Sequence, residues 1–174
     1  RQIFKLPGGR MSGSFDEIIE KVIAAIDSGD FQEAADLAKK CIELDRKNPE
    51  GHFFLGEALA GLEMPKEAIA AYEAGLKLAP EDSDALTCLG DIYFEQGQHK
   101  DALKLYEKIV KIDPNDADGY VNIGLVYNSM ERAADAIKAY EAALKIDPDN
   151  VFAYNALGDA WFGLGNRDKA IEAF

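Results

Sequence analysis

The stretch SDALTCLGDIYFEQGQHKDALKLYEKIVKIDPND, residues 83–116, is followed directly by ADGYVNIGLVYNSMERAADAIKAYEAALKIDPDN, residues 117–150. The two stretches have the same length, and both end in Ile-Asp-Pro followed by two polar residues. Pro80, Pro114 and Pro148 lie 34 residues apart. A period of this length predicts a chain built from repeated structural units.

The same period aligns most of the chain when repeats begin at residues 15, 49, 83, 117 and 151. Residues are numbered below by their place in such a repeat. Place 20 holds alanine in every repeat, at Ala34, Ala68, Ala102, Ala136 and Ala170. Place 8 holds glycine in four repeats, at Gly56, Gly90, Gly124 and Gly158, and place 24 holds an aromatic residue in the same four, at Tyr72, Tyr106, Tyr140 and Phe174.

Each repeat contains two apolar stretches of helical period, separated in the third repeat by Gly97. The pattern predicts paired helices and no strand, with first helices near 15–28, 49–62, 83–96, 117–130 and 151–164. Three helix starts carry capping signals. Ser14 precedes Glu17 with capping-box spacing, Asp30 and Glu33 can open the second helix, and Asn48 precedes Pro49.

The pattern resembles the tetratricopeptide repeat, which has an aromatic or large residue at place 4, Leu-Gly at 7 and 8, Tyr at 11, Ala at 20, an aromatic residue at 24 and Pro at 32. The third repeat matches with Leu86, Leu89, Gly90, Tyr93, Ala102, Tyr106 and Pro114. The family also has a small residue at place 27 and a glycine between the two helices. The departures here are Arg46 for the first proline, Ile109 for the small residue of place 27, and Glu63 and Glu131 for the glycine between helices. The resemblance covers residues 15–174. It implies an all-α, right-handed superhelical solenoid of about five two-helix repeats, the last one incomplete, in which first helices line the concave surface.

Composition and charge favour a folded protein with protein partners. The chain is 48% hydrophobic and 29% charged, and its formal net charge is −13. A negative chain repels the phosphates that dominate nucleic-acid affinity, so DNA and RNA are excluded as partners. No apolar run is long enough to span a membrane, and no signal peptide is recognisable, so we expect no membrane partner and a cytoplasmic location.

No residue pattern indicates catalysis, a metal or a cofactor. His52 and His99 fall on packing places, and the two cysteines lack metal-ligand or redox spacing. Cys41 is expected in the core and Cys88 partly exposed. An open groove also lacks the dry pocket that shifts the pKa of a general acid or base. We therefore predict a protein that is not an enzyme.

The resemblance places the ligand surface at places 2, 5, 6, 9, 12 and 13 of the first helices. None of these thirty positions is Lys or Arg, although the chain has 19 such residues. Helix dipoles explain acids at place 2 but not those at places 9 and 13. The predicted groove residues are Ile19, Ile23, Phe53, Phe54, Glu57, Thr87, Asp91, Phe94, Glu95, Asn122, Leu125, Asn128, Asn155, Asp159 and Phe162. This acidic groove with apolar contacts predicts a scaffold or adaptor for a basic, partly apolar peptide or helix. The alternative interpretation is a generic solvated face.

Two further functions stay open at this stage. The chain could be the targeting or regulatory module of a longer enzyme, such as a glycosyltransferase or kinase. It could also be a structural unit that assembles with itself, through exchange of its N-terminal arm or through an unfinished apolar face at Trp161, Leu164, Ala170 and Phe174. The last repeat stops within its second helix, which indicates a truncated chain.

The first 14 residues belong to no repeat and are read as an arm or a cloning remnant around a native start at Met11. Residues 1–10 carry Arg1, Lys5 and Arg10 with Ile3, Phe4 and Leu6, and no acid. This chemistry matches the predicted ligand. One hypothesis is that the arm lies along inner-helix residues, with Phe4 or Leu6 among groups such as Ile23, Phe53, Phe54 or Phe94. The alternative is a loose terminus.

Overall fold

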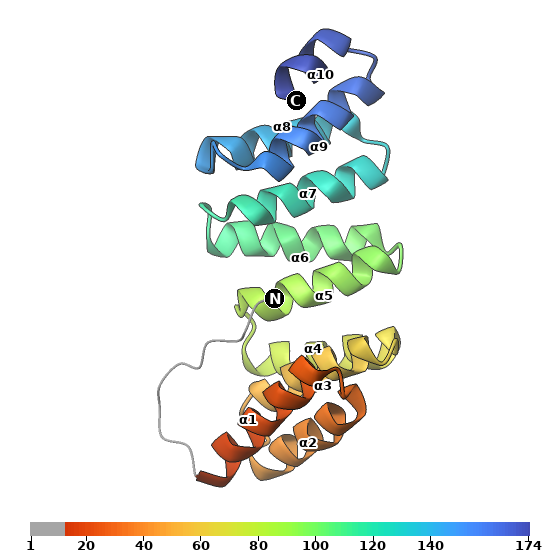
Figure 1. Ribbon diagram of the computed structural model, residues 1–174. Helices are drawn as coiled ribbons and strands as arrows, with labels where there is room; N and C mark the ends of the chain where they lie inside the picture. The colour runs from red at the N-terminus through yellow and green to blue at the C-terminus, as the bar shows by residue number, and fades with distance from the viewer. Residues whose placement is uncertain (1–12) are drawn as a thin grey trace. The chain divides into compact units, whose positions relative to one another are not determined.

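The computed structural model describes residues 13–174, with the side chains of 15–174. The described part contains ten α-helices and no strand, which confirms the predicted all-α solenoid of two-helix repeats (Figure 1). The predictions for Ser14 and for the arm lie outside the residues whose side chains are described. The helices form two compact units, one ending at Ile92 and one running from Tyr93 to Phe174.

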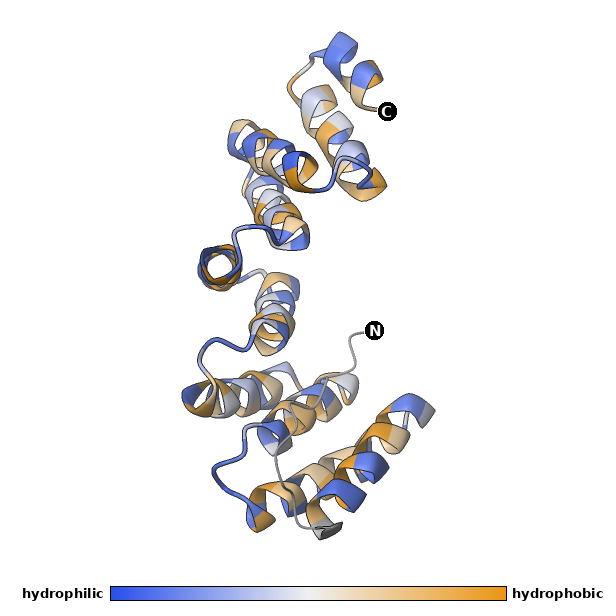
Figure 2. Cartoon of the chain, turned by 90° about the vertical axis from the view of Figure 1, so that its left-hand side faces the viewer, coloured by the Kyte–Doolittle hydropathy of each residue, from blue (hydrophilic) through white to orange (hydrophobic). Residues whose placement is uncertain are grey.

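The first unit contains two complete helical hairpins. Helix α1 (Gly13–Ser28) packs on α2 (Phe31–Leu44), α2 packs on α3 (Glu50–Gly61), and α3 packs on α4 (Pro65–Leu78). Helix α5 (Ser83–Glu95) follows, and the unit boundary falls within it. The helices carry both hydrophobic and hydrophilic residues, and several connecting turns are hydrophilic (Figure 2). In this unit, apolar residues of α1, α2 and α3 are buried together in one cluster.

The second unit repeats this arrangement. Helix α6 (His99–Ile112) packs on α7 (Ala117–Ser129), and α7 packs on α8 (Ala133–Ile146). Helix α8 packs on α9 (Val151–Gly163), which packs on the short α10 (Arg167–Ala173). The observed first helices differ from the predicted ranges by no more than two residues at either end. Repetition of the apolar pattern at a single period is what made these bounds predictable.

The small residues of places 8 and 20 lie where paired helices approach most closely. All five place-20 alanines are buried. A Cβ atom added at Gly56 would overlap the ring of Tyr72, one at Gly124 would overlap Tyr140, and one at Gly158 would overlap Phe174. Each of these three aromatic rings of place 24 therefore fills the space that the facing glycine leaves open.

The turns between paired helices require a left-handed residue. Gly29, Gly97 and Gly165 supply it, with φ between 71° and 80°. Glu63 and Glu131 occupy the same turns with φ of 58°, a conformation that costs a residue with a Cβ about 1–2 kcal/mol. The two glutamates that replace glycine therefore adopt the same left-handed turn, at the cost of backbone strain.

Helix starts use the short polar side chains expected from the sequence. The carboxylate of Asp30 accepts a hydrogen bond from the backbone of Glu33 at 3.0 Å, which confirms it as the N-cap of α2. Asn48 accepts one from the backbone of Glu50 at 3.0 Å, and α3 begins at Glu50, one residue after the predicted proline start. These bonds satisfy backbone donors that the helix itself leaves free.

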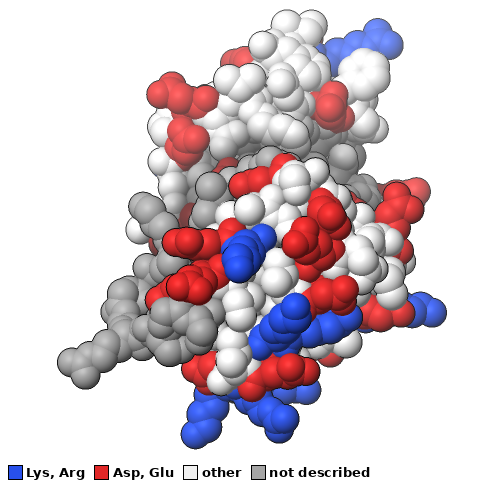
Figure 3. Space-filling model, turned by 60° about the horizontal axis from the view of Figure 1, so that its bottom comes forward, with Lys and Arg blue, Asp and Glu red and all other residues white. Residues whose placement is uncertain are grey.

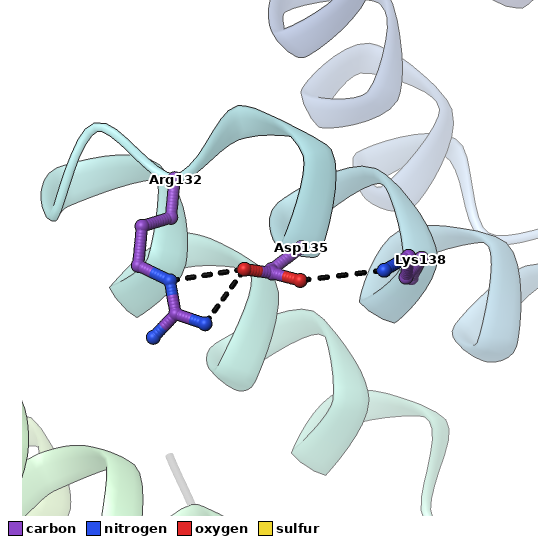
Figure 4. A network of polar contacts seen from close by, with 3 residues as sticks. All are labelled: Arg132, Asp135 and Lys138. Carbon is purple, nitrogen blue, oxygen red and sulfur yellow. Dashed lines mark hydrogen bonds and ion pairs between the residues drawn. The ribbon is translucent and has the colours of Figure 1, made fainter.

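A polar network fixes the start of α8. Arg132 donates from Nε and Nη2 to Oδ2 of Asp135 at 2.9 and 2.7 Å, and Lys138 donates to Oδ1 at 3.5 Å (Figure 4). The guanidinium also lies 4.5 Å from the centre of the Tyr127 ring. These contacts hold the pKa of Asp135 below its usual range, chiefly through the hydrogen bond from Arg132. Arg132 precedes the first residue of α8, and Lys138 lies within α8.

The expected apolar surface near residue 174 is present in part. Leu164 and Phe174 are exposed as predicted, and Ile171, which was not predicted, is exposed as well. Ala170 is instead buried, because it is the place-20 residue of its own hairpin. Trp161 is half-buried, with the ammonium of Lys169 lying 4.0 Å from its ring centre.

Candidate functional site

The first helices of consecutive repeats lie next to each other within each unit. Helix α1 contacts α3 as well as α2, and α7 contacts α9 as well as α8. Side chains on these helices that point away from the second helices therefore share one surface in each unit. We call these surfaces the inner face of the first unit and the inner face of the second unit.

Three predicted groove residues are core residues. Ile19, Phe53 and Phe54 are almost fully buried. Ile19 and Phe54 belong to one apolar cluster with Ala34, Ala38 and Cys41. Phe53 lies where a Cβ of Gly75 would be, and its ring stacks on Tyr72 with centroids 6.3 Å apart. Burial leaves these side chains unavailable to a ligand, so they are omitted from the candidate site.

The remaining predicted residues of the first unit reach its surface. Asp91 is exposed, while Ile23, Glu57 and Thr87 are half-buried. The hydroxyl of Thr87 donates to the carbonyl of Ser83 at 2.9 Å, so its polar atom is engaged within its own helix. The accessible chemistry of this face is therefore carboxylate and aliphatic.

A buried tyrosine connects α3, α4 and α5 beneath this face. The hydroxyl of Tyr72 donates a hydrogen bond to the sulfur of Cys88. Burial is the main cause that raises the pKa of Tyr72, and the charges of Glu57 and Asp91 raise it further. The two carboxylates belong to two consecutive first helices, α3 and α5.

Further acids gather at the start of the first helices in this unit. Burial raises the pKa of Glu50, and the charges of Asp16 and Asp82 add to the effect. Burial and the charge of Asp82 raise the pKa of Asp84 in the same way. A raised carboxyl pKa means that the ionised form is disfavoured there. A bound cation would relieve that cost.

The predicted residues of the second unit are more exposed. Glu95, Asn128, Asn155, Asp159 and Phe162 are exposed, and Asn122 and Leu125 are half-buried. Phe94 is half-buried against the imidazole of His99, with ring centroids 5.5 Å apart. This face offers carboxylates, carboxamides and an exposed aromatic ring.

Tyr140 lies beneath the inner face of the second unit. It is 0% exposed, and its hydroxyl has no hydrogen-bond partner among the described residues. Burial, followed by the charge of Asp159, raises its pKa to about 12. From the sequence, Tyr140 is predicted only as a packing residue, because an aromatic residue at place 24 does not show whether its hydroxyl will have a hydrogen-bond partner.

The cations of the chain lie elsewhere. Lys39 pairs with Asp36 at 3.3 Å and Lys104 with Asp101 at 2.9 Å, and all four residues are on second helices. Figure 3, which brings the end of the molecule with α1 and α2 forward, shows several Lys and Arg along its lower edge. In both of these pairs the lysine contacts an acid of its own helix.

The thiols are not activated for catalysis. Burial raises the pKa of both Cys41 and Cys88 to about 11, with the charge of Glu50 adding to the effect at Cys41. A thiolate is the reactive form, so both are poor nucleophiles at neutral pH. Across residues 13–174, no group of three or more His, Cys, Asp or Glu could hold a metal ion, and no described helix is long and apolar enough to cross a membrane.

Four repeat-family models match this chain in succession. Three described as tetratricopeptide repeat match residues 19–63, 49–82 and 71–104. One described as TPR repeat matches residues 90–131 and 126–165. A curated relative, Tetratricopeptide repeat protein 37 of Xenopus laevis, is 30% identical over 81 residues. That match covers 47% of this chain and only 5% of the relative.

Solved structures of MamA are similar over nearly the whole chain. One crystal structure of MamA is 30% identical with a TM-score of 0.80, covering 88% of this chain and 90% of that one. MamA from residue 41 to its end, from Desulfovibrio magneticus RS-1, is 26% identical with a TM-score of 0.85, covering 95% and 93%. The motif places, the paired helices and the successive family matches agree. The chain belongs to the tetratricopeptide-repeat family.

Proposed function

We propose that this chain is a scaffold that holds a basic, partly apolar protein segment against its inner faces. A role in protein interaction is supported by the repeat family and by the likeness to MamA. The chemistry of the partner is inferred from the faces themselves. The proposed contacts exclude Ile19, Phe53 and Phe54 because they are buried.

The distribution of charge is the observation that carries this proposal. No repeat has Lys or Arg at places 2, 5, 6, 9, 12 or 13 of its first helix. Three repeats have an acid at place 9, namely Glu57, Asp91 and Asp159. Asp91 and Asp159 are exposed and Glu57 is half-buried. Complementary charge speeds encounter and selects partners of opposite sign. A basic segment is therefore the favoured ligand.

Apolar contacts would complete the site. Ile23 in the first unit and Leu125 in the second are half-buried, and Phe162 is exposed. A segment with leucine-like side chains between its cations could bury these surfaces, and such burial contributes about 25 cal/mol per Å². This is why the partner is described as partly apolar rather than as a plain polycation.

Charge reversal on the inner faces tests the proposal. We expect the variant Glu57→Lys, Asp91→Lys, Asp159→Lys to bind a labelled peptide of alternating Lys-Lys and Leu-Leu pairs at least about tenfold more weakly, since three attractive contacts become repulsive. Fluorescence anisotropy would measure the affinity. The same peptide with Glu in place of Lys should not bind the unmodified chain.

A matched variant controls for overall charge. Glu67, Glu107 and Glu141 are exposed acids on second helices, and their replacement by Lys changes the net charge by the same amount. This outer variant should lose affinity only slightly. Equal losses in the inner and outer variants would show that the peptide responds to net charge and would defeat the proposed site.

A second candidate function is that of a repeat module within a longer protein. The match to only 5% of Tetratricopeptide repeat protein 37 shows that similar repeats occur inside a much longer chain. The inner faces would then position a catalytic domain or its substrate. A catalytic domain encoded in the same reading frame would favour this function.

A further inference from the structure

Helix α6 is the one basic helix in the described part of the chain. It contains four lysines and two acids, so its formal charge is +2. Each of the other helices in residues 13–174 has at least as many acids as cations. The charge of α6 is therefore opposite in sign to that of the whole chain, which is −13.

The lysines of α6 form a single stripe on its outward side. We call this surface the lysine stripe, and it consists of Lys100, Lys104, Lys108 and Lys111. Spacings of three and four residues place them on one face of the helix, opposite the buried Ala102, Tyr106 and Ile109. Three of the lysines are exposed and Lys108 is half-buried. Lys104 pairs with Asp101 of its own helix at 2.9 Å, an exposed pair that another carboxylate can exchange.

The repeat architecture does not require this stripe. At the same four places, α2 has one lysine, and α4 and α8 have two each. Ala70 and Ala74 occupy two of these places in α4, so the fold accepts an uncharged residue there. The stripe is therefore a property of α6 alone and not a consequence of the helix packing that the repeats share.

The inner face of the first unit carries the opposite charge. Helix α3 contains two acids and α5 three, and neither contains Lys or Arg. Burial, followed by the charge of neighbouring acids, raises the pKa of both Glu50 and Asp84. Cations brought to this face would offset the mutual repulsion of its carboxylates. The same chain therefore contains a basic helix and an acidic face that are complementary in charge.

We propose that the lysine stripe of one copy of this chain docks on the inner face of the first unit of a second copy. This inference rests on the proposed function, because it identifies the basic segment as a helix of the chain itself. Ammonium groups of the stripe pair with Glu57 and Asp91. Ile112, which is 37% exposed at the end of α6, supplies the apolar part of the contact.

A helix of this kind suits the face better than a flexible basic segment does. The helix is already folded and packed on α7, so its backbone loses no conformational freedom on binding. Docking of a helix by one face is a common way to recognise a partner. Because the donor and acceptor surfaces differ, each copy can use both at once, and association continues to larger assemblies instead of stopping at a dimer.

The net charge of the chain sets the conditions for this association. Two copies of charge −13 repel each other at a distance. At physiological salt the screening length is about 8 Å, which weakens that repulsion more than it weakens ion pairs in contact. At about 1 M salt the screening length falls to about 3 Å and the ion pairs are weakened too. We therefore expect self-association at physiological salt and its loss at about 1 M.

Sedimentation velocity on the unmodified chain gives the first measurement. The average mass should rise with protein concentration between about 10 and 500 μM at physiological salt, as expected for a weak contact. A chain that stays monomeric over this range would overturn the inference. If the basic peptide still binds the inner faces of that monomeric chain, the proposed function stands without it, and if neither partner binds, both fail.

Two variants, each lacking one of the surfaces, give the decisive test. The donor variant is Lys100→Gln, Lys104→Gln, Lys111→Gln, and the acceptor variant is Glu57→Gln, Asp91→Asn. Each alone should associate at least about tenfold more weakly than the unmodified chain. Their equimolar mixture should form a species of two chains and nothing larger, because each molecule keeps one intact surface. A mixture that stays monomeric would contradict the pairing of these two surfaces.

A third variant and two peptide probes complete the experiment. Lys66→Gln, Lys77→Gln, Lys145→Gln removes three exposed lysines outside α6, and it should associate as the unmodified chain does. The donor variant should bind the peptide of Lys-Lys and Leu-Leu pairs with unchanged affinity, since its inner faces are intact. Equal loss of association in the third variant and the donor variant would overturn the stripe. Binding of a polyglutamate peptide to α6 without self-association would assign the stripe to an acidic partner and overturn the second copy.

Discussion

Phe54→Ala is expected to lower the free energy of unfolding by about 3–5 kcal/mol, because it removes an aromatic ring from the core. Phe54 is 3% exposed and belongs to the apolar cluster that joins α1, α2 and α3. Few side chains can refill this space, since its neighbours are alanines and other packed residues. Chemical denaturation followed by circular dichroism would measure the change.

Phe162→Ala provides the matched control for this substitution. Its side chain is 63% exposed, so the same truncation should change stability by less than about 0.5 kcal/mol. Similar losses in the two variants would contradict the assignment of Phe54 to the core and Phe162 to the surface. Comparing the stabilities of Phe54→Ala and Phe162→Ala therefore tests whether Phe54 lies in the core and Phe162 on the surface.

Gly124→Leu is expected to destabilise the chain by about 1–3 kcal/mol through overpacking. Any Cβ at this position overlaps the ring of Tyr140, which is fully buried and cannot swing into solvent without opening the core. The helices α7 and α8 would have to separate at their closest approach. Thermal unfolding monitored by circular dichroism would report a lower melting midpoint.

Gly163→Leu is the appropriate comparison. Gly163 is the last residue of α9, and a Cβ there meets no atom within 4 Å. We expect little change or a small gain in stability, because glycine is a poor helix former. An unchanged midpoint for Gly124→Leu would mean that place 8 is not the contact between paired helices.

The sequence was sufficient to predict the helices and their pairing. Alanine at place 20 and glycine at place 8 recur because two backbones approach there, and this demand is the same in every repeat. The left-handed turns could also be located, although Glu63 and Glu131 replace the expected glycine. The fold could be predicted because the same residue types recur at the same places in several repeats, so that each repeat indicates the same local structure.

The candidate site could be predicted only in part, because its residues vary from repeat to repeat. Place 5 holds a buried Ile19, a buried Phe53 and an exposed Asn155. Phe53 turns into the core because Gly75 leaves room for its ring, and this depends on a residue 22 positions away in the sequence. Pairwise packing of this kind cannot be read from a repeat place alone.

The buried hydroxyls show a second limit. Tyr72 and Tyr140 are equivalent in the repeat pattern, yet only one of them has a partner. The two tyrosines differ because Cys88 follows the first and Ala156 follows the second at the equivalent place. Nothing in the sequence marks either residue as a hydrogen-bond partner or its absence. Polar satisfaction depends on which side chains meet across helices, so it became visible only in the structure.

NMR mapping would show directly which surface of the chain holds a basic segment. A spin-labelled peptide of alternating Lys-Lys and Leu-Leu pairs would broaden amide signals close to its binding surface. The account predicts broadening around Glu57 and Asp91 in the first unit and around Leu125 and Asp159 in the second. Broadening confined to the second helices α2, α4, α6 and α8, or no saturable broadening, would contradict it.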